Sequence, residues 1–165
     1  MNPRRFTSVA EQYHLTYLAQ KLQLDQTAKF GIDLRDDKIG VELKSRLNIY
    51  TANFAVHEYQ VNHFREELPH HTLFWAFMMY QLYNPIVGMR EQEIETQIHS
   101  RETWILPWDW VRQFPISLAK TGPYIYVHHK YFPKSDECIT LEENESILHF
   151  PEGWGLEGRL QGEKE

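Results

Sequence analysis

Hydrophobic residues recur with a helical period near the N-terminus. Leu15, Leu18 and Leu22 are three and four positions apart, so they share one face of an amphipathic helix. Ser8 and Glu11 have the spacing of a capping box, and we expect the helix to begin at Ser8.

Strand-like patterns follow this helix. The segment AKFGIDL, the charged cluster RDDK and the segment IGVELKSRL predict a β-hairpin over residues 28–47. The continuous apolar run HTLFWAFMMYQL, residues 71–82, is typical of a strand buried on both faces. TWIL, YIYVHHKYF and SILHF are further β-prone runs.

Three other segments favour helical structure. Residues 51–67 contain no Pro or Gly and are predicted to form a helix that ends before Pro69. REQEIETQI is expected to be a short polar helix, and PWDWVRQF begins with a proline that a first helical turn accepts. The last eleven residues, 155–165, are expected to be frayed.

This order of elements predicts the α/β class, with a central mixed β-sheet flanked by helices. The length of 165 residues and the absence of a linker predict a single domain over residues 1–165. Neither GxGxxG nor GxxxxGK[ST] occurs, which argues against a doubly wound nucleotide-binding fold.

Charge is distributed unevenly along the chain. The net charge is −6, but residues 136–165 contain nine acids and only two bases, and the remainder has a charge of +1. A nucleic-acid partner is therefore not excluded.

The sequence has no membrane-spanning apolar run and no signal peptide, so we expect a soluble, cytoplasmic protein. Cys138, the single cysteine, rules out an internal disulfide and a cysteine-rich zinc site.

The predicted hairpin carries the candidate chemistry. Asp33 is expected on its first strand, and Glu42 and Lys44 share one face of its second strand, opposite the apolar Val41 and Leu43. Two carboxylates on neighbouring strands are hard-oxygen ligands suited to Mg²⁺. A nearby ammonium group can stabilise negative charge on a phosphate, so such a site can hydrolyse a phosphodiester.

The segment GIDLRDDKIGVELKS resembles the active-site hairpin of the PD-(D/E)xK, or restriction-endonuclease-like, nuclease superfamily, with Asp33, Glu42 and Lys44 in the motif positions. The order of elements over residues 8–82 is similar to the core of that family. The motif proline is absent, because Ile32 precedes Asp33. The resemblance implies a restriction-endonuclease-like core and Mg²⁺-dependent cleavage of double-stranded DNA.

The acid-x-Lys pattern occurs twice and is not specific by itself. Asp36 and Lys38 lie in a run of charged residues that suits a solvated turn. Glu42 and Lys44 alternate with apolar residues, as a strand requires, so we assign the chemistry to them. The alternative is a strand whose Glu and Lys are simply solvated.

Glu11 lies at one end of the leucine stripe of the first helix. The family resemblance implies that this glutamate is an additional metal ligand beside Asp33 and Glu42. The alternative role, completion of the capping box with Ser8, remains open. His57 and Gln60, three positions apart, are weaker candidates for a polar residue that approaches the metal or the scissile phosphate.

The chain has no acid between Asp109 and Asp136, a window that also contains several tyrosines. Bases interleaved with aromatic residues suit contacts with phosphates and bases, and we expect Arg112, Lys120, Lys130 and Lys134 to contact DNA. Alternatively, YIYVHHKYF is a strand whose alternate tyrosines pack into the core.

His70-His71 and His128-His129 lack the spacing of a zinc site. The tryptophans of WILPWDWV are expected in the core or in a dimer interface.

We therefore predict a Mg²⁺-dependent, site-specific endonuclease of the restriction or homing type. Because one active site cuts one strand, we expect a homodimer or a dimer of dimers. A Holliday-junction resolvase is disfavoured, because those proteins tend to be more basic. The competing hypothesis is a noncatalytic α/β module for protein interaction or assembly.

Overall fold

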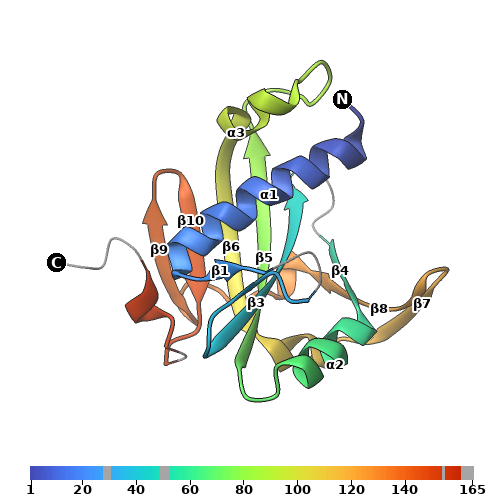
Figure 1. Ribbon diagram of the computed structural model, residues 1–165, viewed down its shortest axis with the longest axis vertical. Coiled ribbons are helices and arrows are strands. Elements are labelled where there is room, and N and C mark those ends of the chain that lie inside the picture. Colours follow the sequence, from blue (N-terminus) through green and yellow to red (C-terminus); the bar gives the residue numbers. More distant parts are fainter. Residues whose placement is uncertain (28–30, 49–52, 154, 161–165) are drawn as a thin grey trace.

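The structure is a computed structural model and describes residues 1–27, 31–48, 53–153 and 155–160. A seven-stranded mixed sheet forms the centre of this described part of the chain (Figure 1). The strand order is β1-β2-β3-β5-β6-β10-β9, and a smaller sheet has the order β4-β8-β7. The strands of the large sheet are β1 (Asp25–Gln26), β2 (Leu34–Arg35), β3 (Ile39–Leu47), β5 (Thr72–Leu82), β6 (Ile98–Pro107), β9 (Ile139–Glu143) and β10 (Ser146–Phe150).

Helix α1 (Pro3–Leu22) crosses one face of the large sheet (Figure 1). It begins five residues earlier than the predicted Ser8, because the side chain of Asn2 caps it by accepting a hydrogen bond from the backbone N–H of Arg4. Pro3 occupies the first helical turn, where its missing N–H has no cost. The capping box of Ser8 and Glu11 was therefore a wrong interpretation.

The predicted hairpin is confirmed as β2 and β3, which pair antiparallel with Leu34 opposite Val41. Its first strand is much shorter than expected, and residues 28–30 lie outside the described residues. Asp33 was predicted to lie on this strand, but it lies in the bend directly before it. No strand of the described chain pairs with β3 beyond Val41 on this side, so β3 has an open edge there.

The single helix predicted over residues 51–67 was wrong. Residues 51–52 lie outside the described residues, and the rest forms strand β4 (Asn53–His57) and helix α2 (Glu58–Glu67). Phe54 and Val56 are buried whereas Ala55 between them is exposed, which is the alternation of a strand.

The buried run predicted as a strand is confirmed in β5, which pairs parallel with β3 and antiparallel with β6. Its two faces contribute to different parts of the core. Trp75 and Phe77 pack with residues of α2, whereas Phe74 and Met78 pack with the leucines of α1. The leucine stripe of α1 is thus confirmed, and the protein has the predicted α/β class with a mixed central sheet between helices.

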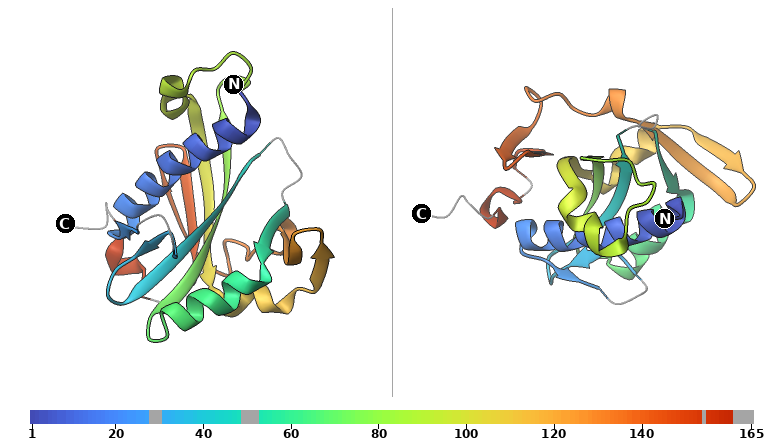
Figure 2. Two further views of the ribbon diagram at one scale, coloured as in Figure 1. Left: turned by 45° about the vertical axis from the view of Figure 1, so that its right-hand side comes forward. Right: turned by 90° about the horizontal axis from the view of Figure 1, so that it is seen from above.

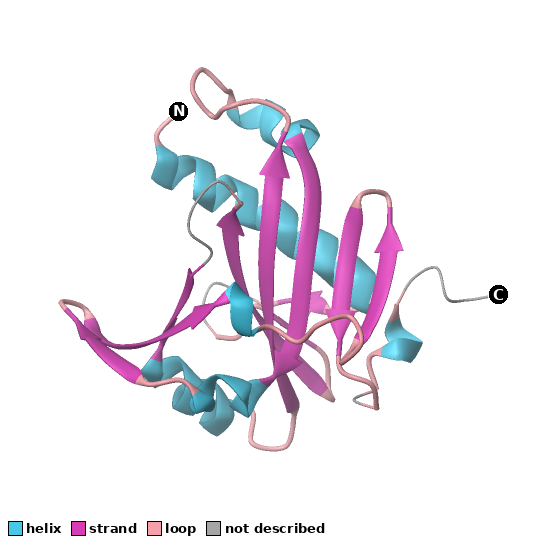
Figure 3. Ribbon diagram, turned by 180° about the vertical axis from the view of Figure 1, so that it is seen from behind, coloured by secondary structure: helices cyan, strands magenta, loops and turns pink. Residues whose placement is uncertain are grey.

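The smaller sheet consists of β4, β8 (Gly122–His128) and β7 (Ile116–Ala119). Its β7–β8 hairpin projects from the body of the protein (Figure 2). Ile125 and Val127 of β8 are buried and Tyr126 is exposed, so the alternative in which the tyrosines of YIYVHHKYF fill the core is wrong. The view from behind shows this sheet beside α2 at one end of the large sheet (Figure 3).

Short helical turns complete the chain. REQEIETQI forms the turn η1 (Glu91–Glu93) and helix α3 (Ile94–Gln97), and WDWVRQ forms η2 (Trp108–Gln113) after Pro107. The ring of Trp108 stacks on that of Trp75 with centroids 3.8 Å apart, which confirms a core position. The turn η3 (His129–Tyr131) follows β8.

The expectation of a frayed C-terminus was wrong for residues 155–160. This segment forms the turn η4 (Glu157–Arg159), and Leu156 and Leu160 are buried against the core that α1 covers. Residues 161–165 lie outside the described residues. Within the described ranges, no helix has the length and apolar character needed to cross a membrane.

Candidate active site

Asp33 and Glu42 lie side by side at the open edge of β3. The backbone N–H of Asp33 donates a hydrogen bond to Oε1 of Glu42 (3.0 Å). In return, Oδ2 of Asp33 accepts from the backbone N–H of Leu43 (2.9 Å), a donor that a longer β2 would have used. Each carboxylate is thus fixed by a hydrogen bond from a backbone N–H group. The second oxygen of each carboxylate takes no part in these two bonds.

The loop before Asp33 is held by specific backbone features. Gly31 has φ +105°, a conformation that side chains disfavour, and Ile32 is fully buried. The backbone N–H of Thr27 donates to the carbonyl of Asp33 (3.0 Å), and the Thr27 hydroxyl donates to the carbonyl of Ile32. The carboxylate is therefore positioned by Gly31, by the buried Ile32 and by the bonds with Thr27, without a ladder of strand hydrogen bonds.

Lys44 and Gln60 complete the polar cluster on the same face. Nζ of Lys44 donates to Oε1 of Gln60 (2.9 Å) and lies 3.9 Å from Oε2 of Glu42. Nε2 of Gln60 is 3.5 Å from that same glutamate oxygen. Gln60 of α2 therefore contacts both members of the Glu42–Lys44 pair, and α2 fixes their orientation.

Burial has a large effect on the carboxyl groups. Glu42 is only 6% exposed, and burial followed by the charge of Asp33 raises its pKa to about 9, although Lys44 acts in the opposite direction. Burial also raises the pKa of Asp33, against the lowering effects of the Leu43 N–H, Glu42 and Lys44. Two adjacent acids in a buried position favour a state in which they share a proton or a cation.

Glu11 approaches the cluster from α1. Burial, and then the charge of Asp33, raise the pKa of its carboxyl group, whereas Lys44 lowers it. Glu11 is therefore electrostatically coupled to two of the predicted site residues. Since Asn2 caps α1, the capping role that competed with a role in the site no longer applies.

The donor set fits a hard cation. Asp33 and Glu42 offer carboxylate oxygens, and Mg²⁺ typically takes one or two protein carboxylates together with waters and substrate. Within the described ranges, however, no three His, Cys, Asp or Glu side chains come together as metal ligands. Two of the three predicted ligands thus form the pair, and Glu11 stands beside it without completing a three-carboxylate cluster.

The second acid-x-Lys pair has a structural role in the turn between β2 and β3. Oδ1 of Asp36 accepts from the backbone N–H groups of Lys38 and Ile39, both at 2.8 Å, and Oδ2 pairs with Arg159. Partial burial raises the pKa of Asp36, but these hydrogen bonds and Arg159 outweigh it, and the net pKa is lowered. Asp36 thus organises the hairpin turn and anchors the C-terminal segment.

His57 does not join the cluster. It is the last residue of β4, and its Nε2 forms a hydrogen bond with the Tyr124 hydroxyl (2.8 Å). The expectation that His57 and Gln60 share a helix face was wrong, because the helix begins only at Glu58. Only Gln60 of this pair reaches Glu42 and Lys44.

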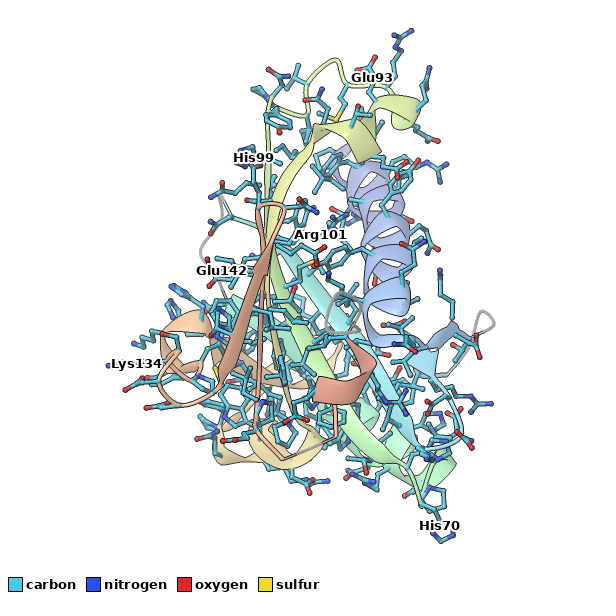
Figure 4. All side chains as sticks on the ribbon, turned by 90° about the vertical axis from the view of Figure 1, so that its left-hand side faces the viewer. His70, Glu93, His99, Arg101, Lys134 and Glu142 are labelled. Atoms are coloured by element: carbon cyan, nitrogen blue, oxygen red, sulfur yellow. The ribbon has the colours of Figure 1, made fainter. Side chains whose placement is uncertain are left out.

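The four predicted DNA-contacting residues are all exposed and lie outside the carboxylate cluster. Arg112 is held by Asp109 (3.1 Å) and Asn62 (3.0 Å). Lys120 lies at the turn of the β7–β8 hairpin, and the ammonium of Lys130 lies over the ring of Tyr131. Lys134 projects away from the sheet on the side opposite α1 (Figure 4).

A comparison of the chain with models of known protein families finds no match, and a search of curated proteins finds none either.

Proposed function

We propose that the chain is a Mg²⁺-dependent endonuclease that hydrolyses phosphodiester bonds of double-stranded DNA. The observation that carries the proposal is the buried pair of carboxylates, Asp33 and Glu42, next to the ammonium of Lys44 at an open strand edge. A purely structural role does not explain why folding brings two acids together at the cost of raising both pKa values.

The order of elements supports this reading. Helix α1, the β2–β3 hairpin, helix α2 and strand β5 parallel to β3 occur in the order that the resemblance to the PD-(D/E)xK superfamily implies, with the additional strand β4 between the hairpin and α2. Glu42 and Lys44 lie on the second strand of the hairpin, as the resemblance implies, whereas Asp33 lies in the bend directly before its first strand. Ile32 in place of the motif proline packs into the core.

Asp33 and Glu42 would hold the metal ion, and Glu11 adds negative charge nearby. When bound, Mg²⁺ supplies a water of lowered pKa and a positive charge close to the scissile phosphate. Hydrogen bonds from the backbone N–H groups of Leu43 and Asp33 fix the two carboxylates, which would in turn hold the cation in place. Their rigidity provides the preorganisation that electrostatic catalysis needs.

Lys44 has a separate task in this proposal. Its ammonium group stabilises negative charge that develops on the phosphate in the transition state. Gln60 keeps the ammonium beside Glu42 by accepting its hydrogen bond, so Gln60 is a positioning residue. Arg112, Lys120, Lys130 and Lys134 are assigned to contacts with DNA phosphates outside the reacting bond.

Incubation with plasmid DNA tests the proposal. Cleavage is expected with Mg²⁺ or Mn²⁺ and is expected to be weak with Ca²⁺, which accepts looser coordination geometry. Cutting that continues unchanged in excess EDTA would contradict metal dependence. Complete inactivity on varied DNA with every metal would favour the noncatalytic interaction module instead.

Lys44→Ala, with Lys38→Ala as matched control, tests the assigned residue. Lys44→Ala should abolish cleavage and leave DNA binding largely intact, because the ammonium acts on the transition state. Lys38→Ala should remain active, since the structure uses the backbone N–H of Lys38 in the turn. An inactive Lys38→Ala enzyme together with an active Lys44→Ala enzyme would reverse the assignment.

A further inference from the structure

The outward face of the small sheet carries aromatic side chains. Tyr124 and Tyr126 of β8 alternate with the buried Ile125 and Val127, so both tyrosines point away from the core. His57 of β4 lies opposite Tyr124 in the register of the sheet and therefore shares this face. Figure 3 shows the sheet at one end of the large sheet, beside α2.

Ring contacts join these side chains into one row. The ring centroid of Tyr124 lies 4.1 Å from that of His57 and 5.9 Å from that of Tyr126. Tyr59, in the first turn of α2, extends the row, with its centroid 5.5 Å from that of His57. We call these four side chains the aromatic row. Its two ends are its most exposed parts, since Tyr59 is 63% and Tyr126 is 44% exposed.

Hydrogen bonds hold the centre of the aromatic row in place. The hydroxyl group of Tyr124 is 2.8 Å from Nε2 of His57 and 2.9 Å from the hydroxyl oxygen of Thr121. Ala55 lies opposite Tyr126 in the register, is exposed, and is too small to cover that ring. The row is thus a fixed surface whose outer rings remain open to a ligand.

The face that carries the aromatic row differs from an apolar docking surface. Ile116 and Leu118 of β7 are exposed, but they belong to the opposite face, because Ile116 pairs with the buried Ile125. Ser117, which pairs with Tyr124, lies on the face of the row. This face therefore presents rings and small polar groups, which suit a flat ligand with polar edges such as a nucleobase.

The charge around the aromatic row favours a nucleic acid. None of the residues of β4, β7 and β8 is acidic, and Glu58 at the start of α2 is the only acid among residues 53–59. Exposed lysines lie at both ends of β8, with Lys120 in the turn before it and Lys130 two residues after it. Proteins that bind single-stranded nucleic acids combine such cationic groups with aromatic rings on which the bases stack.

We propose that the aromatic row binds unpaired nucleotides of a DNA strand, with bases stacked on the rings of Tyr59 and Tyr126. Lys120 and Lys130 lie where they can contact the phosphates of that strand. Tyr59 directly precedes Gln60, which contacts Lys44, so the row meets the candidate active site at α2. The identity of the strand as DNA rests on the proposed nuclease function, whereas stacking does not require cleavage.

Binding of a labelled single-stranded oligonucleotide to the full chain in excess EDTA tests the inference. Tyr59→Ala and Tyr126→Ala should each weaken binding about tenfold. Both should keep the wild-type slope of log affinity against log salt, because no phosphate contact is lost. Tyr126→Phe, which keeps the ring, should bind like the wild type. The matched control is Tyr83→Ala, which removes a tyrosine that is 60% exposed and lies outside the row.

Two changes of the ligand show whether the rings contact bases. Binding to a duplex of the same sequence should not depend on Tyr126, because paired bases are already stacked within the duplex. An oligonucleotide with abasic sites should bind the wild type more weakly than the intact strand does. At one position in the series, the abasic site should cause little further loss in Tyr126→Ala, since the stacking partner is already absent.

Several results would overturn the inference. Row variants that bind the single strand like Tyr83→Ala would do so, as would a Tyr126→Phe protein as weak as Tyr126→Ala. Equal losses on the single strand and the duplex would also reject base stacking. Row variants that change the sedimentation of the DNA-free protein, but not its affinity for DNA, would assign the face to a second copy of the chain.

The same measurements separate this inference from the proposed function. A protein that cuts duplex DNA with Mg²⁺, and whose row variants keep their affinity for the single strand, would reject the stacking surface and leave the nuclease proposal intact. A protein that never cuts DNA, but whose row variants lose affinity for the single strand as expected, would support the stacking surface and reject the nuclease. Tighter binding to RNA of the same sequence would overturn the assignment to DNA.

Discussion

Burial of Glu42 makes the free energy of unfolding depend on pH. Its pKa in the folded chain is about 9, against 4.5 for an ordinary glutamate, because of burial and then of Asp33. The folded chain therefore holds a proton that the unfolded chain has already lost. Stability from this group is fully present below about pH 4.5 and is lost as the pH rises through about 9. We expect the Tm of the metal-free protein to fall across this range.

Thermal unfolding in EDTA at a series of pH values measures this effect. Each kcal/mol corresponds to about 2–4 °C in Tm for a chain of this size. Glu42→Gln should remove most of the decline, because an amide does not ionise. Mg²⁺ should raise the wild-type Tm at alkaline pH, since a cation stabilises the ionised pair, and should have little effect on the variant. A Tm of the wild type that is unchanged from about pH 5 to 9 would contradict the raised pKa.

Glu11 provides a second test at the level of one residue. It lies in the middle of α1 and is coupled to Asp33 by charge. Replacement by Gln keeps the shape and removes the charge, so we expect the cleavage rate to fall about 10- to 100-fold, as for groups that support a metal site. Steady-state rates at several Mg²⁺ concentrations measure the loss. A Glu11→Gln enzyme with unchanged rate and metal dependence would remove Glu11 from the site.

At the level of elements, the start of α1 yields a stability prediction. Asn2→Ala removes the side chain that caps the helix and should lower the free energy of unfolding by about 1 kcal/mol. Ser8→Ala changes an exposed position inside the helix, where alanine is the better helix former, and should be neutral or slightly stabilising. Urea unfolding of the two variants measures both values. If Ser8→Ala lowered the free energy of unfolding more than Asn2→Ala, Ser8 would be the cap of the helix.

Elements with one dominant periodicity were predictable from the sequence. The unbroken apolar run of β5 and the leucine stripe of α1 each match a single kind of element, and both are confirmed. The strand before α2 was not predictable in this way, because the apolar positions of that segment suited a helix as well as a strand. Pairing with β8 decides for a strand over Asn53–His57, and that contact is remote in the sequence.

The candidate site was predictable to a similar extent. Alternation along β3 correctly placed Glu42 and Lys44 on one face, since strand geometry fixes that relation locally. The role of Gln60 depends on how α2 packs beside β3, which no local pattern specifies. The position of Asp33 outside β2 depends on the bend around Gly31, whose positive φ results from the folded loop.

The contact between His14 of α1 and Arg101 of β6 illustrates the same limit. His14 lies next to the leucine stripe, is fully buried, and accepts a hydrogen bond from Nε of Arg101 (3.0 Å). Burial, and then Arg101, lower its pKa to about 3, so the imidazole is neutral. Arg101 belongs to β6 and points towards α1 (Figure 4). Only the packing of α1 on the sheet joins residues so far apart in the sequence.

At the scale of the whole molecule, the strand order places part of the acidic C-terminal third away from the candidate active site. Acids of the C-terminal third, such as Glu142 and Glu143, lie on β9 at one edge of the large sheet. The Asp33–Glu42 pair lies towards the other edge, beside β3. Part of the negative charge of the chain therefore lies away from the place where we propose that DNA binds.

The last prediction concerns assembly and follows from the number of candidate active sites in one chain. One chain contains a single Asp33–Glu42–Lys44 cluster, and a single site cuts one DNA strand at a time. Cutting both strands of a duplex site in one binding event needs two such clusters related by two-fold symmetry. We therefore expect a homodimer, or a dimer of dimers, in sedimentation experiments at the concentrations used for cleavage.

Plasmid cleavage at falling protein concentration gives the matching kinetic readout. Above the dissociation constant of the dimer, supercoiled plasmid should become linear with little nicked intermediate. Below it, nicked plasmid should accumulate, because a monomer cuts only one strand before it dissociates. The Lys44→Ala protein, mixed in excess with wild type, should form heterodimers with one active site and raise the nicked fraction. A protein that sediments as a monomer and still linearises plasmid without a nicked intermediate would contradict the symmetric assembly.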